Sequence, residues 1–172
     1  FDPTLTRDGN IMFSSTQANG THNNSNGSTC LLVDNWDGSY PRHIYGNEVS
    51  EQPDAPKIQA REASDGYVYY IEALDNNSGI GNLARVSWTT PHAKTQSRLS
   101  NDGRLYRSPH PLPDGRLMVS SAERQDFGIY YFCADKGTVS ELVYDDPEWN
   151  DHQPQPVYPR YKPRWINSFT AG

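Results

Sequence analysis

The sequence predicts an all-β fold: a β-propeller of about three four-stranded blades, forming part of a larger ring, with a proline-rich extended arm at the C-terminal end. Two observations predict it. Asp-Gly, a dipeptide typical of turns because glycine accepts positive φ and aspartate bonds its own backbone, occurs five times. The sequence also repeats one pattern three times: a proline-containing segment, then an Asp-Gly turn, then an apolar run. Helix is not expected, because no uninterrupted stretch of a dozen residues has a period of 3.6.

The expected strands follow from this repeat. The leading turns are Asp8-Gly9, Asp65-Gly66 and Asp114-Gly115, each preceded by a proline-containing segment that supplies the first strand of its unit. Short runs rich in β-branched, aromatic or other apolar residues predict the strands after these turns. They are 10–15, 29–33 and 42–45 in the first unit, 67–72, 82–88 and 96–99 in the second, and 116–120, 128–133 and 139–144 in the third.

These units predict blades at about 1–50, 51–100 and 101–144, followed by the arm at 145–172, which contains five prolines. A propeller ring needs ~4–8 blades, and three leave unpaired strand edges. We therefore expect a fragment or processed product of a longer chain. Completion of the ring by two copies and an open three-sheet arrangement are the alternatives, and the open edges favour self-association. A β-sandwich is disfavoured, since it does not require the threefold repeat.

Composition limits the partners. The net charge is −6 with a pI of about 5.3, so the chain lacks the basic patch that nucleic acid requires. No apolar run approaches the ~18 residues needed to span a bilayer, so membrane insertion is not expected. The 11 tyrosines, 5 phenylalanines and 4 tryptophans favour a folded chain over a disordered one.

Two segments resemble known propellers. PTLTRDGNIMFSS at 3–15 and PHPLPDGRLMVSS at 109–121 resemble blades of the TolB-type propellers of bacterial envelope proteins. The run from 108 to 164, including SPHPLPDGRLMVSS and ELVYDDPEWNDHQPQPVYPRYKP, is similar to the propeller domain of the family of the hydrazine synthase alpha subunit and its bacterial relatives.

This resemblance implies an extracytoplasmic, noncatalytic scaffold that positions protein domains or subunits. In that family c-type haems in flanking domains are attached through Cys-x-x-Cys-His, and this sequence has no such motif. We therefore expect no catalytic residue and no cofactor within the segment, with haem c expected only in flanking domains. The alternatives are a part of a multi-haem redox enzyme and a carbohydrate-active propeller, the latter motivated by the many Tyr and Trp that stack on sugars.

His110 is the best candidate for a ligand-binding residue. It precedes a proline-rich turn in a segment expected to border the central channel, and a histidine hydrogen-bonded within its own blade is the alternative. In the arm, aromatic side chains are candidates for docking a partner or neighbouring blades, with a simple linker as the alternative. These are Trp149, Tyr158, Tyr161 and Trp165.

Metal and covalent sites are weakly indicated. Cys30 and Cys133 are expected to be two buried strand cysteines, with a disulfide as the alternative. The acidic runs 34–38 and 145–148 do not fit the calcium-loop register and are better explained as turns, so no metal is expected. His22 lies in a polar loop and is expected to be exposed. Asn-x-Ser/Thr occurs at Asn19, Asn23, Asn26 and Asn76, where it would carry glycans only in a secreted eukaryotic protein.

Overall fold

The computed structural model describes residues 2–16, 29–46, 55–75, 77–124 and 126–159. Within them the chain forms β-strands and a single short 3-10 helix. The strands are β1 (Thr4–Leu5), β2 (Ile11–Ser15), β3 (Cys30–Asp34), β4 (Arg42–Tyr45), β5 (Lys57–Glu62), β6 (Tyr67–Ala73), β7 (Gly81–Ser87), β8 (Ser97–Arg98), β9 (Leu105–Pro111), β10 (Leu117–Ala122), β11 (Gly128–Cys133) and β12 (Thr138–Tyr144); the helix is η1 (Ala93–Thr95).

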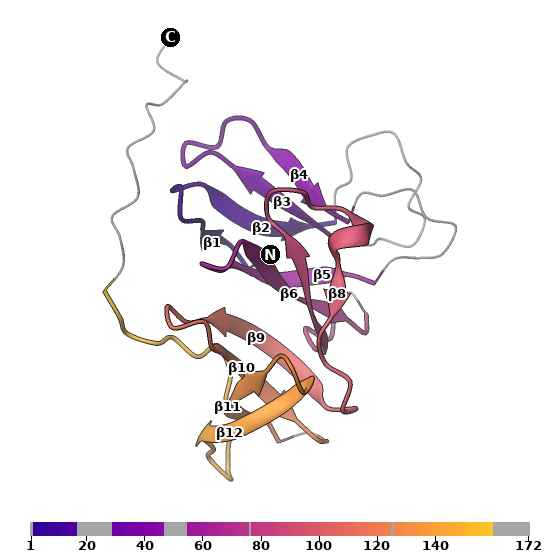
Figure 1. Ribbon diagram of the computed structural model, residues 1–172, viewed down its shortest axis with the longest axis vertical. Coiled ribbons are helices and arrows are strands. Elements are labelled where there is room, and N and C mark those ends of the chain that lie inside the picture. Colours follow the sequence, from indigo (N-terminus) through magenta and orange to yellow (C-terminus); the bar gives the residue numbers. More distant parts are fainter. Residues whose placement is uncertain (1, 17–28, 47–54, 76, 125, 160–172) are drawn as a thin grey trace.

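Every strand pairs antiparallel with its neighbour, and the strands form three groups of four (Figure 1). β1 to β4 form one sheet in sequence order, while β5 to β8 and β9 to β12 form two further groups. The second and third groups are joined into one sheet by a single pairing, Gly81 opposite Tyr106. The all-β propeller architecture predicted from the sequence is confirmed, and we call the groups the first, second and third blades. The residue boundaries of the domains stay a prediction.

The Asp-Gly turns form because glycine adopts positive φ and aspartate hydrogen-bonds the backbone, as predicted from the sequence. The five glycines have φ between 76° and 86°, a region that favours glycine. At Asp37, Asp65, Asp102 and Asp114, Oδ1 accepts a hydrogen bond of 3.0–3.1 Å from the backbone N–H two residues later. The aspartate therefore fixes each of these turns with its own side chain.

The proline-containing segment of the third unit, expected at 108–113, belongs to a strand that starts earlier. β9 begins at Leu105 and includes Pro109. Proline is tolerated there because Ser108 has φ 50° and the pairing with β10 shifts register at this point. Such a bulge leaves a residue without a ladder hydrogen bond, so the missing N–H of proline costs little.

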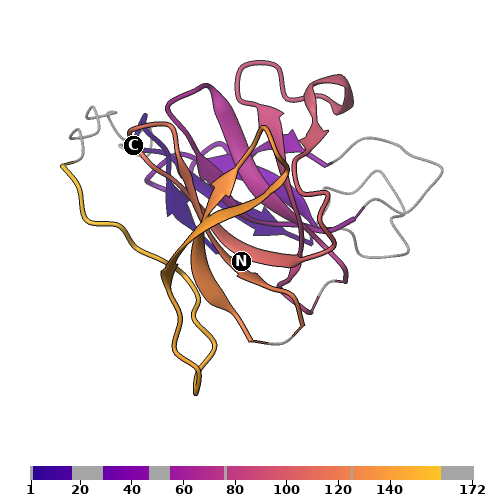
Figure 2. The ribbon, with the colours of Figure 1, turned by 60° about the horizontal axis from the view of Figure 1, so that its bottom comes forward.

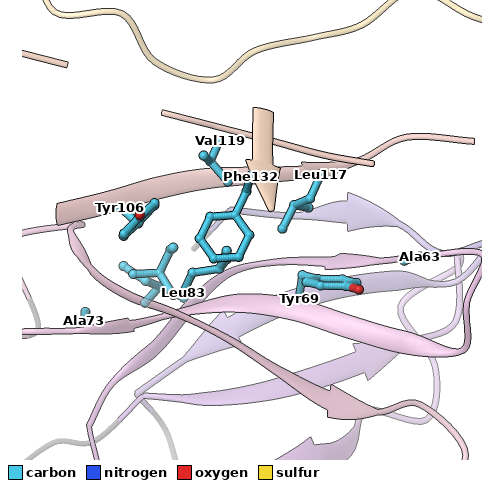
Figure 3. Packing of buried hydrophobic residues seen from close by; sticks show 10 residues of the cluster. Ala63, Tyr69, Ala73, Leu83, Tyr106, Leu117, Val119 and Phe132 are labelled. Atoms are coloured by element: carbon cyan, nitrogen blue, oxygen red, sulfur yellow. The ribbon is translucent and has the colours of Figure 1, made fainter. Parts of the chain in front are cut away.

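Two apolar clusters hold the three blades together. One joins the second and third blades, where Tyr106, Val119 and Phe132 of the third blade meet Leu83 of the second (Figure 3). The rings of Tyr106 and Phe132 are 5.5 Å apart and nearly perpendicular. The other cluster joins the first and second blades through Met12, Leu31, Val33, Tyr45, Ala60, Val68, Tyr70, Ala84 and Val86. Burying a Val, Leu, Ile, Phe or Met side chain contributes about 1.5–3 kcal/mol, so these clusters stabilise the contacts between blades.

Residues 145–159 form no strand or helix, and in Figure 2 they leave β12 and return alongside the third blade. We call this stretch the C-terminal segment. The assignment of 145–172 as a separate extended arm stays a prediction. No helix in the described ranges has the length and apolar character needed to cross a membrane.

Candidate functional site

An unusual backbone conformation occurs at equivalent positions in the three blades, within the first strand of the second and third blades and just before the first strand of the first. Asp2, Gln59 and Ser108 have φ of 50°, 56° and 50°, and each lies six residues before the aspartate of its leading Asp-Gly turn. In the second and third blades the strand pairing shifts register at this residue. These are β-bulges, which re-aim the side chains around them and are frequent next to functional sites.

Gln59 links two of these bulges. Its Nε2 donates to O of Gly79 at 3.1 Å, and its Oε1 accepts from N of Ser108 at 2.6 Å. The side chain is buried, with 7% of its surface exposed. The amide therefore satisfies backbone groups from both blades and fixes β5 beside β9.

Two arginines flank this link. Arg61 lies on β5 and Arg107 on β9, and both are half-buried. Burial lowers the pKa of each guanidinium, and the negative charge of Asp2 opposes this in both cases. Asp2, which precedes β1, thus acts electrostatically on arginines from the first strands of the other two blades.

His110 and Tyr158, both singled out from the sequence, come together in the structure. His110 lies on β9 opposite Met118, with 8% of its surface exposed. The ring of Tyr158, from the C-terminal segment, stands edge-on to His110 with centroids 6.4 Å apart. Tyr158 also packs against the cluster of Leu112, Met118 and Ile129. The ligand-binding role of His110 stays a prediction, and the structure places the residue beneath a tyrosine from the C-terminal segment.

Hydrogen bonds attach the C-terminal segment to the third blade. Oγ of Ser120 donates to O of Asp151 at 2.5 Å, and N of Asp151 donates to O of Phe127 at 2.6 Å. N of Phe127 in turn donates to Oδ1 of Asn150 at 3.0 Å. The ring of His152 stands edge-on to that of Phe127. These contacts explain a serine that is fully buried in β10: it anchors the segment.

The other predicted docking residues are placed differently. Trp149 is 72% exposed at the turn of the C-terminal segment, near the end of β12, where Leu142, Val143 and Tyr144 are also exposed. Tyr161 and Trp165 lie outside the described residues, as do His22 and the four Asn-x-Ser/Thr asparagines. Of the predicted aromatic residues, the structure therefore brings Tyr158 onto the blade and leaves Trp149 available at the surface.

The cysteines are not bonded to each other. Cys30 is buried in β3, and Cys133, at the end of β11, is half-buried; both are free. Sγ of Cys30 lies 3.5 Å from Nδ1 of His43 on the neighbouring strand β4. Burial raises the pKa of the Cys30 thiol, which disfavours the reactive thiolate. Sequence reasoning missed this pair, because only the strand pairing brings the two residues together.

Neither a metal-ligand cluster nor an unpaired charged pocket stands out among the described residues. Among the described residues no group of three or more His, Cys, Asp or Glu side chains could hold a metal ion. In the acidic run at 34–38, Oδ1 of Asp37 accepts hydrogen bonds from N and Oγ of Ser39, which is turn chemistry. An open, polar cavity of about 390 Å³ lies beside Asp102, Gly103, Arg104, Glu123 and Thr138. Its main charged groups are already paired, since Nη1 of Arg104 lies 2.7 Å from Oε1 of Glu123.

Comparison with known proteins shows which protein this chain resembles over its whole length. The whole chain aligns, at 55% identity, with the hydrazine synthase subunit alpha of Kuenenia stuttgartiensis. The chain is closely similar to one segment of the hydrazine synthase alpha subunit. The solved structure of Kuenenia stuttgartiensis hydrazine synthase matches the entire chain with a TM-score of 0.91 at 54% identity.

The resemblance found in the sequence is therefore confirmed and extends over the whole chain. The chain spans 22% of the hydrazine synthase alpha subunit and 23% of the matching chain in the solved structure. No protein-family model matches it. The TolB-type label is compatible with the blade architecture and stays a resemblance.

The residues of this chain do not fit covalent attachment of haem c. Such attachment requires two cysteines and a histidine in Cys-x-x-Cys-His order. The two cysteines of the chain lie on β3 and β11, in different blades, and neither begins such a motif. Haem c in flanking domains stays a prediction.

Proposed function

We propose that this chain is a noncatalytic scaffold, a propeller segment of an extracytoplasmic protein related to the hydrazine synthase alpha subunit. The observation that carries the proposal is the 55% identity over the full chain to a segment of that subunit. The continuous apolar packing between blades supports a rigid body, which is what a scaffold requires.

The proposed partners are protein domains or subunits. Trp149 and the outer-strand residues Leu142 and Tyr144 present apolar side chains at one end of the third blade, with 72%, 52% and 57% of their surfaces exposed. Aromatic side chains are enriched at the energetic centres of protein interfaces. A net charge of −6 disfavours nucleic acid as the partner.

Assembly of the native protein tests the scaffold function. Trp149→Ala is expected to lower the fraction of the native protein found in its full assembly, measured by mass photometry, because it removes an exposed aromatic anchor. Val157→Ala is the matched control, since Val157 is fully exposed on the same segment. Unchanged assembly of Trp149→Ala, or equal loss in both variants, would contradict this docking role.

The second candidate is a part of a multi-haem redox enzyme whose haems lie outside this segment, favoured by the similarity to hydrazine synthase. The intact mass and visible absorption spectrum of the native protein test it. A mass well above 19.4 kDa with a Soret band supports a redox enzyme that uses this segment as scaffold. A colourless native protein contradicts it. Fractionation of the native cells tests the extracytoplasmic location, which a purely cytoplasmic protein would overturn.

A further inference from the structure

An arginine on the first strand of the third blade is short of a hydrogen-bond acceptor. Nε of Arg107 is buried and makes no hydrogen bond within the described part of the chain. A guanidinium carries five N–H donors, and a buried donor without an acceptor is costly, more so on a charged group. Arg107 therefore has a donor available for a further acceptor.

The charge of Arg107 is partly removed from water, because the side chain is half-buried on β9. A charge removed from water is costly unless it is paired. Burial lowers the pKa of this guanidinium, and the negative charge of Asp2 opposes that effect. An anion bound directly to the guanidinium would compensate for its burial.

Groups from both blades surround the guanidinium of Arg107. A Cβ atom at Gly79 would lie 3.8 Å from Nη2 of Arg107 and 3.7 Å from Nε2 of Gln59, so the guanidinium lies beside the amide that links the bulges. Phe127, which holds the C-terminal segment, also lies close, with its ring centroid 5.7 Å from Cζ of Arg107. Oγ of Ser108 is also buried and lacks a partner among the described residues.

We propose that Arg107 forms a binding site for a carboxylate or other small oxyanion where the first strands of the second and third blades meet. The planar guanidinium matches the two oxygens of a carboxylate, which is why arginine is preferred at such sites. This site goes beyond the scaffold role, since it assigns a ligand chemistry to the position beside the bulge at Ser108.

The anion has two possible sources, a free solute or a carboxylate side chain from another part of the native protein, and the experiment separates them. Binding of acetate and of sulfate to the native protein is measured by calorimetry and by the shift in Tm with anion concentration. Arg107→Met removes the guanidinium and keeps a long apolar stem. Arg116→Met is the matched control, because Arg116 is an exposed arginine of the same blade whose partner is Asp114.

For a free anion, we expect a concentration-dependent rise in Tm of the unmodified protein, at least tenfold weaker binding in Arg107→Met, and binding within twofold of the unmodified protein in Arg116→Met. If Arg107→Met does not fold, Arg107→Lys is used instead. It keeps the charge but loses the two-pronged geometry, and tenfold weaker binding is again expected.

For an internal carboxylate, acetate and sulfate do not shift the Tm, and a crystal structure of the native protein shows an aspartate or glutamate oxygen within about 3 Å of a guanidinium nitrogen of Arg107. Either result supports the site. Water alone around Arg107 with no anion effect, or an equal anion effect in the unmodified protein and Arg107→Met, would overturn it.

Discussion

The hydroxyl of Tyr69 donates a 2.6 Å hydrogen bond to Oδ2 of Asp65, while Oδ1 of the same carboxylate accepts from N of Tyr67 at 3.0 Å. Asp102 repeats this arrangement in the next Asp-Gly turn: its Oδ2 accepts from the hydroxyl of Tyr106 at 2.7 Å. One carboxylate thus fixes a turn and also satisfies a buried tyrosine four residues later.

Tyr69→Phe should reduce the loss of stability at alkaline pH. Burial, assisted by the hydrogen bond to Asp65, raises the pKa of Tyr69 to about 12. The unfolded value is about 10, so the stabilising contribution is fully present below about pH 10 and is lost as the pH rises through about 12. We expect the unmodified protein to lose on the order of 2 kcal/mol more than Tyr69→Phe across this window.

Urea unfolding at a series of pH values above neutrality measures this difference. Tyr144→Phe is the control, because Tyr144 is 57% exposed on the outer strand and should leave the pH dependence unchanged. The same alkaline slope in Tyr69→Phe and in the unmodified protein would show that the buried hydroxyl does not carry the effect.

Gly81→Ala should strongly destabilise the joined sheet. A Cβ atom at Gly81 would lie 1.9 Å from the backbone O of Glu72, a distance that only movement of the paired strand could relieve. We expect a loss of at least about 2 kcal/mol in the free energy of unfolding. Gly103→Asn is the control, since nothing lies within 4 Å of a Cβ there and asparagine tolerates its φ of 76°. A change below about 0.5 kcal/mol in Gly81→Ala would contradict the close approach.

Leu83→Ala should weaken the packing between the second and third blades. Leu83 is fully buried in the cluster that joins them, and such truncations cost about 2–5 kcal/mol. Leu142→Ala removes the same atoms from a half-exposed site on β12 and should change stability by less than about 0.5 kcal/mol. Chemical denaturation of both variants checks the prediction, which fails if the two losses are equal.

Ser120→Ala should release the C-terminal segment from the third blade. The substitution removes the donor to O of Asp151 and costs about 1 kcal/mol, or roughly fivefold in local opening. Hydrogen exchange should therefore speed up at the amide of Asp151, which donates to O of Phe127. Ser140→Ala, which removes an exposed hydrogen bond to O of Tyr131, should leave this amide unchanged. Equal exchange in all three proteins would show that Ser120 does not anchor the segment.

Local rules account for the parts of the fold that the sequence predicted well. The strand at Arg42–Tyr45 and the strand at Gly128–Cys133 have the predicted bounds, because apolar runs between turn residues define them. The start of β9 was missed, since the expected segment was defined by its prolines at 108–113, and the bulge at Ser108 that accommodates them depends on pairing with β10.

The candidate site was less predictable. His110 and Tyr158 were chosen separately, and nothing in their spacing indicates that the C-terminal segment folds back to bring their rings together. The arginines of β5 and β9 had no sequence motif at all. Their proximity to Asp2 depends on the packing of three blades, which is information carried by tertiary structure.

The bulges of the second and third blades also set the register between their first two strands. Because of the register shift, Ile58 and Arg61 stand opposite Ile71 and Tyr69, two positions on one face of β6, although they are three positions apart along β5. Deleting Ala60 would restore a regular strand with Arg61 still opposite Tyr69, and would remove the bulge from which Gln59 reaches N of Ser108. The loops between blades differ in length, whereas this six-residue interval is the same in all three. Insertions made to engineer this propeller therefore belong in the loops, outside that interval.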